Sequence, residues 1–143
     1  MAARAGAPEQ VADRLHSAAV TLLRRLRRED GGLAIGPART SALAVLVFGG
    51  PKTMGELAAI EQVRPPTMSR IVAALEADLL ALRESDPADR RVQRVRATTL
   101  GRRVAQRGRE RRVGALTDRL RAHCAEDIAL LDRAAELIER LAR

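Results

Sequence analysis

Apolar residues recur every three or four positions over much of this chain, which is the spacing of amphipathic helices. The first such stripe lies in residues 9–29 and includes Leu15 and Leu22. A second apolar run begins after Pro37 and stops before Gly49, and proline is favoured in the first turn of a helix whereas paired glycines end one. The pattern therefore predicts two helices, of which the second is largely buried.

Two shorter helical segments follow. Thr53 and Glu56 have the spacing of a capping box, in which the hydroxyl accepts from the Glu56 N–H and the carboxylate accepts from the Thr53 N–H. This predicts a short helix ending near Gln62, and a second helix starts at one of the two prolines of residues 65–66 and ends near Asp78. The residues expected on its buried face are Met68, Ile71, Val72, Leu75 and Leu79. Two short helices joined by a tight turn are typical of a helix-turn-helix.

The pattern then changes from helical to alternating. Two strand-like runs, residues 80–84 and 92–97, flank a segment with Asp-Pro turn chemistry. In the second run Arg94 and Arg96 share one face, while Val95 lies on the other. A β-hairpin with a charged tip is the prediction.

Helical periodicity resumes from Thr98 or Thr99 in a long helix, and a last helix starts near Ala125. The fold class is therefore mainly α with a small β-hairpin wing (α+β), a winged helix-turn-helix flanked by N- and C-terminal helices. A chain of 143 residues is long enough for one domain with a modest core, so we expect residues 1–143 to form a single domain.

The net charge of the chain indicates the kind of partner that it binds. Lys and Arg total 26 against 18 Asp and Glu, giving a net charge of +8. Such an excess favours a polyanionic partner, although a genome that favours arginine codons would produce a similar composition. The single aromatic residue, Phe48, argues against a single-strand binder that stacks bases on aromatic rings.

The positions of the basic residues favour duplex DNA. A recognition helix lies in the major groove with its first residues at the base edges, where Arg70 is placed to make a bidentate contact to guanine. At the hairpin tip, Asp89 is placed to orient an arginine by a charge-assisted pair for insertion into a narrow minor groove. The alternative for both segments is a solvated charged surface. The predicted DNA-contacting residues are Arg64, Pro66, Thr67, Ser69, Arg70, Arg83, Asp89, Arg90, Arg91 and Arg94.

Several short motifs occur in the order and spacing of a known family. They are Thr53-Met54-Gly55-Glu56-Leu57-Ala58, Pro66-Thr67-Met68-Ser69-Arg70, Leu75-Glu76, Arg83, Asp86-Pro87-Ala88-Asp89-Arg90-Arg91 and Thr98-Thr99-Leu100-Gly101. In them the chain resembles the MarR (multiple antibiotic resistance regulator) family of winged-helix transcription factors. The resemblance implies that Arg70 contacts bases and that Arg91 lies at the wing tip. The chain has Leu79 where the family usually has glycine, which would alter the turn or the register of the wing.

The first and last helices carry apolar stripes for which so short a chain has no evident third partner, so they are expected to associate between subunits. The alternative is that they cover their own core. The expected interface residues are Val11, Leu15, Leu22, Leu26, Leu120, Ile128, Leu131, Ile138 and Leu141. The resemblance likewise implies interlocked first and last helices in a homodimer. We thus assign residues 9–29 and 113–143 to dimerisation, and residues 35–112, including the start of the long helix, to the DNA-binding lobe.

The sequence contains no constellation for catalysis, so no enzyme activity is expected. Cys124, His16 and His123 are isolated in sequence, and neither a metal nor a cofactor is expected. No apolar stretch is long enough to span a membrane, and we expect a cytoplasmic protein. The prediction is a sequence-specific repressor of transcription, with a non-specific architectural DNA-binding protein as the alternative. The resemblance adds a small-molecule effector, with a site between the dimer helices and the DNA-binding lobe.

Overall fold

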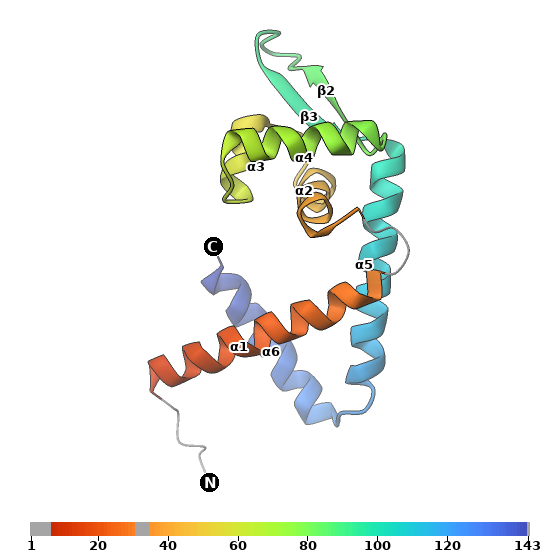
Figure 1. The fold of residues 1–143 in the computed structure, drawn as a ribbon. Coiled ribbons are helices and arrows are strands. Elements are labelled where there is room, and N and C mark those ends of the chain that lie inside the picture. Colours follow the sequence, from red (N-terminus) through yellow and green to blue (C-terminus); the bar gives the residue numbers. More distant parts are fainter. Residues whose placement is uncertain (1–6, 31–34, 143) are drawn as a thin grey trace. The chain divides into compact units, whose positions relative to one another are not determined.

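A computed structural model describes residues 7–30 and 35–142 of the chain (Figure 1). Its elements are α1 (Pro8–Arg27), a 3-10 turn (Arg28–Asp30), α2 (Pro37–Phe48), β1 (Lys52–Thr53), α3 (Met54–Ile60), α4 (Pro65–Ala77), β2 (Ala81–Ser85), β3 (Gln93–Ala97), α5 (Thr99–Leu120) and α6 (Ala125–Leu141). The helices and the hairpin predicted from the sequence are all confirmed. The chain divides into two compact units, Asp30–Glu110 and a unit that combines Met1–Glu29 with Arg111–Arg143.

The core of the central unit is aliphatic and lies where α2, α3, α4 and the sheet meet. Its largest fully buried side chains are Leu43, Leu57, Met68, Val72, Leu75 and Val95. The capping box forms as predicted, because Thr53 Oγ1 accepts from the Glu56 N–H at 3.2 Å and Glu56 Oε2 accepts from the Thr53 N–H at 2.7 Å. The cap fixes where α3 begins, and α4 follows α3 along the chain and crosses it (Figure 1).

The sheet has three antiparallel strands in the order β1-β3-β2. β2 and β3 form the predicted hairpin, with Ala81 opposite Ala97 and Ser85 opposite Gln93. Val95 is buried, as its alternation with Arg94 and Arg96 predicts. β1 is not predicted from the sequence, because its two residues are too few to show a period of two.

The prediction that Leu79 is buried is wrong, because 69% of it is exposed. α4 ends at Ala77, and Leu79 adopts a left-handed conformation with φ +60°. Its N–H donates to Glu76 O at 2.9 Å, while the Leu80 N–H donates to Leu75 O at 2.8 Å, which are the two bonds of a Schellman motif. The left-handed residue therefore reverses the chain so that Leu80 is buried instead, and a leucine occupies a backbone conformation that favours glycine.

The start of α5 is joined to the same turn. Thr98 caps the helix, since its Oγ1 accepts from the Gly101 N–H at 3.0 Å and donates to Leu79 O at 2.7 Å. The Thr98 N–H donates to Leu80 O at 3.0 Å. Gly101 lies so close to this carbonyl that a Cβ on it would be 2.0 Å from Leu80 O. The Thr-x-x-Gly motif thus allows the first turn of α5 to contact the backbone that leads into the wing.

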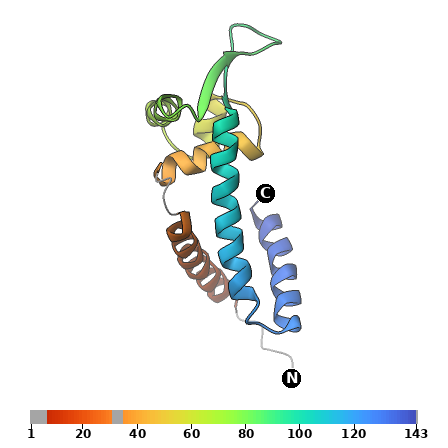
Figure 2. The same cartoon turned by 90° about the vertical axis from the view of Figure 1, so that its right-hand side faces the viewer.

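The other unit is different in kind. It contains the helices α1 and α6 (Figure 2). Neither helix has a buried side chain among the described residues. Large apolar side chains are exposed along both helices, including Leu22, Ile128 and Leu131. These helices do not form a closed core within one chain.

Candidate nucleic-acid interface

The first turns of α4 present a polar face. Met68 and Val72 are buried in the core, and this orientation leaves the opposite side of the helix to solvent. The predicted contact residues Arg64, Pro66, Thr67, Ser69 and Arg70 are all exposed there, with Arg64 at the N-cap. In the described part of the chain, neither Arg64 nor Arg70 has an intramolecular ion-pair partner. The two guanidinium groups are therefore available to an anionic ligand.

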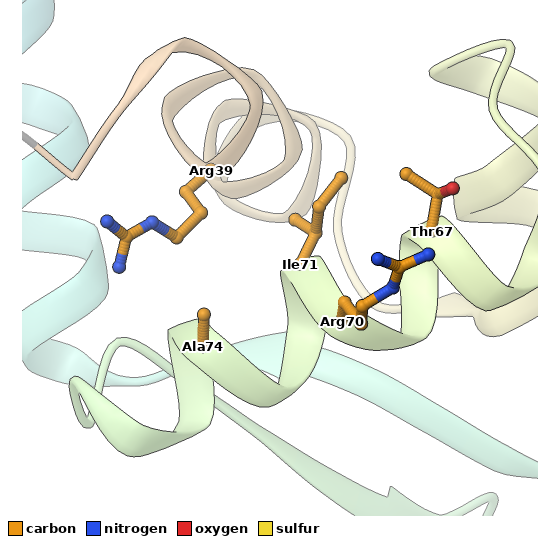
Figure 3. A pocket seen from close by; sticks show the side chains of 5 residues that line it. All are labelled: Arg39, Thr67, Arg70, Ile71 and Ala74. Carbon is orange, nitrogen blue, oxygen red and sulfur yellow. The ribbon is translucent and has the colours of Figure 1, made fainter.

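A hollow of about 290 Å³ lies beside this face (Figure 3). It is lined by Thr67, Arg70, Ile71 and Ala74 of α4 and by Arg39 of α2. Arg39 Nη1 donates to Asp78 Oδ2 at 2.7 Å, so the far end of α4 holds this arginine beside the recognition face. Arg39 is not among the residues predicted from the sequence, because only the packing of α2 on α4 brings it beside this face.

The wing tip is an ordered turn. Asp89 Oδ1 accepts from the backbone N–H of Arg91 at 3.0 Å, and Asp89 O accepts from the N–H of Val92 at 2.9 Å. The carboxylate thus orients the tip through its backbone and not through the side-chain pair expected from the sequence. Arg90 and Arg91 are exposed on this turn.

The two predicted contact residues on the strands have partners within the chain. Arg83 on β2 lies 3.4 Å from Glu76 of α4. Arg94 on β3 donates through Nε to Asp86 Oδ2, and its Nη1 lies 3.5 Å from Oε2 of Glu56. Two predicted DNA contacts are therefore engaged in ion pairs that join the wing to the two helices of the helix-turn-helix.

These contacts shift the titration of the acidic groups. Hydrogen bonds from the Arg94 guanidinium and from the Ala88 N–H, the latter at 2.7 Å, lower the pKa of Asp86. Hydrogen bonds from the backbone and side chain of Thr53 lower the pKa of Glu56, with a smaller contribution from Arg94. Asp86 in turn raises the pKa of Arg94. The three groups are therefore charged together at neutral pH.

The predicted dimer residues lie outside this lobe, along α1, α5 and α6. Leu15, Leu26 and Leu120 are half-buried, and the other six are exposed: Val11, Leu22, Ile128, Leu131, Ile138 and Leu141. None of the helices in the described part of the chain has the length and apolar character that crossing a bilayer requires.

Comparison with known proteins identifies relatives of this architecture. A sequence model described as the MarR family matches residues 37–92, from α2 into the wing. An uncharacterised HTH-type transcriptional regulator of Mycobacterium leprae is 33% identical over 132 residues, which cover 92% of each chain. A crystal structure of a transcriptional regulator from Thermotoga maritima has 28% identity and a TM-score of 0.76, covering 94% of this chain and 96% of that one. The structure of a MarR family protein from Bacillus stearothermophilus has 26% identity and a TM-score of 0.84, covering 97% of this chain and all of the other.

Proposed function

Because this chain belongs to the MarR family of DNA-binding transcriptional regulators, which are not enzymes, we propose that it is a repressor that binds a pseudo-palindromic operator as a homodimer. Repression, the twofold symmetry of the operator and the residues that contact the operator are the parts of this function that we propose. Recognition of duplex DNA by sequence distinguishes this function from that of an architectural protein.

The observation that carries the proposal is the free arginine on the exposed face of α4. Arg70 is exposed among short polar side chains, and none of the described residues forms an ion pair with it. A guanidinium in the first turns of a recognition helix has the geometry for O6 and N7 of guanine. Arg90 and Arg91, exposed at the wing tip, supply the minor-groove or phosphate contacts beside it.

The exposed apolar residues of α1 and α6 support the homodimer. Helices whose side chains are at most half-buried within one chain need a second surface, and a twofold dimer supplies the same surface from the partner. Such a dimer sets two recognition helices about 34 Å apart, one turn of DNA. The operator would then consist of two inverted half-sites.

The test is fluorescence anisotropy with a labelled duplex from upstream of the protein's own reading frame, beside a scrambled duplex, at two salt concentrations. We expect selective binding to the upstream duplex that weakens steeply with salt. Arg70→Ala should weaken binding by about 1–3 kcal/mol for each half-site and remove discrimination at one base pair of each half-site. Equal affinity for both duplexes would identify an architectural binder, and no binding to either would contradict the proposal.

Repression and effector control need separate measurements. Deleting the gene should raise expression from a reporter joined to the upstream DNA, and lower expression would contradict repression. The family resemblance implies a small-molecule effector without naming it, and small aromatic acids, which act on other family members, are the first probes. Adding such acids to the preformed complex should lower the anisotropy, and unchanged anisotropy across the series would remove this part of the proposal.

A further inference from the structure

We propose that Arg94 is a positioning residue that fixes the wing on the helix-turn-helix, and that it does not contact DNA. This inference rests on the proposed DNA-binding function and revises one of the contacts predicted from the sequence. Its basis is the way the guanidinium is shared between the base of the wing tip and the start of α3.

At the wing, the partner of Arg94 is Asp86, which directly follows β2. Asp86 is only 9% exposed and is the one charged residue among the buried described residues. Its carboxylate accepts from Arg94 Nε and from the Ala88 N–H, while its own N–H donates to Val92 O at 2.8 Å. Asp86 therefore connects both sides of the turn that carries Arg90 and Arg91.

At the helix, the partner of Arg94 is Glu56, the acidic residue of the capping box. The same oxygen, Glu56 Oε2, accepts from the Thr53 N–H at 2.7 Å and lies 3.5 Å from Arg94 Nη1. Thr53 is also paired with Arg94 in the register of β1 and β3. One guanidinium thus joins the wing turn, two strands and the first turn of α3.

Moving Arg94 onto a phosphate would undo this arrangement. It would leave Asp86, a nearly buried carboxylate, without its cation, and a carboxylate with little access to water is destabilised when it loses a hydrogen-bond donor. Lysine could not replace Arg94, since a single ammonium lacks the fork that reaches two carboxylates on different elements. The role of Arg94 is to set the direction in which the tip arginines leave the lobe, so its effect on DNA is exerted through Arg91.

A double-mutant cycle between Arg94→Gln and Arg91→Ala tests this role in the anisotropy assay. If Arg94 acts by placing Arg91, Arg94→Gln weakens operator binding about tenfold in the wild-type background and less than about twofold in Arg91→Ala. Two independent phosphate contacts would instead give additive losses. Arg96→Gln is the matched control: Arg96 lies on the same face of β3, pairs with Glu84 at 2.5 Å, and its loss should be additive with Arg91→Ala.

Asp86→Asn provides a second test in which the two roles predict opposite signs. It keeps the shape of the side chain but removes a negative charge from the wing, so it would strengthen binding if Arg94 were freed for phosphate. Positioning by the pair predicts weaker binding, by about fivefold, with a far-ultraviolet circular dichroism spectrum like that of the wild type.

Additive losses in the cycle, a tighter complex with Asp86→Asn, or full rescue by Arg94→Lys would each overturn the proposal. Should Arg94→Gln fail to fold, the sign of the Asp86→Asn effect decides. Failure of the wild-type protein to select its operator would instead refute the proposed function, so the two failures are distinguishable.

Discussion

Replacing Gly101 with alanine should destabilise the protein although alanine is the better helix former. The added Cβ would lie 2.0 Å from Leu80 O, 2.9 Å from Leu80 C and 3.1 Å from Leu43 Cδ1. Two of these three atoms belong to a backbone held by the Thr98 N–H at 3.0 Å, so they cannot rotate away. Inserting a methyl group into such a contact costs about 3 kcal/mol, at the upper end of the range for overpacking. The gain in helix propensity is about 1 kcal/mol, which leaves a net loss of about 2 kcal/mol.

Gly114→Ala is the matched control on the same helix, because a Cβ there meets nothing within 4 Å. It should raise stability by up to about 1 kcal/mol. Both variants are compared with the wild type by urea unfolding at equal protein concentration, followed by circular dichroism because the chain has neither Trp nor Tyr. Equal stability of Gly101→Ala and Gly114→Ala would refute the argument that close backbone approach requires glycine at residue 101.

Three further predictions concern the turn, the acid range and the dimer. Leu79→Gly should raise the free energy of unfolding by about 0.5–1 kcal/mol, because glycine adopts φ +60° without strain. A lower free energy of unfolding would show that the contacts of this leucine stabilise the fold by more than its left-handed conformation costs. The lowered pKa values of Asp86 and Glu56 mean that their contribution to stability is complete above the ordinary carboxyl range and is lost as the pH falls below about 4. Below about pH 4, the free energy of unfolding of Asp86→Asn should therefore fall less steeply with pH than that of the wild type. An identical slope would contradict the contribution assigned to Asp86. Ile138→Asp should convert the dimer to monomer in light scattering and abolish operator binding, whereas a dimeric variant would place the interface elsewhere.

Local signals predicted most of the fold. The Thr53–Glu56 spacing fixed the start of α3, because both partners of the capping box lie within one turn. Prolines predict the first turns of α2 and α4, because proline is favoured at the first position of a helix. These features depend on residues close in sequence, so they can be predicted without knowledge of the tertiary structure.

The errors arose where long-range packing or turn geometry decides. Leu79 continues the apolar spacing of Leu75, but the helix ends before it and a left-handed leucine has no sequence signature. Alternation predicts that Arg94 lies on the outer face of β3, but it does not predict the ion pair of Arg94 with Asp86, eight residues away across the turn. Arg39 reaches the recognition face only through the packing of two helices. Each of these positions depends on contacts that no periodicity encodes.

The absence of buried side chains from α1 and α6 makes this regulator sensitive to its own abundance. Where the terminal helices bury their apolar faces only against a second copy, dilution removes the part of the folding free energy that the interface contributes. It also removes the twofold dimer that binds DNA. Occupancy of a twofold operator then varies with the square of the chain concentration in the range where monomers predominate. In a cell that produces slightly less of this protein, transcription of its target genes would change more abruptly than the affinity of one lobe for one half-site would suggest.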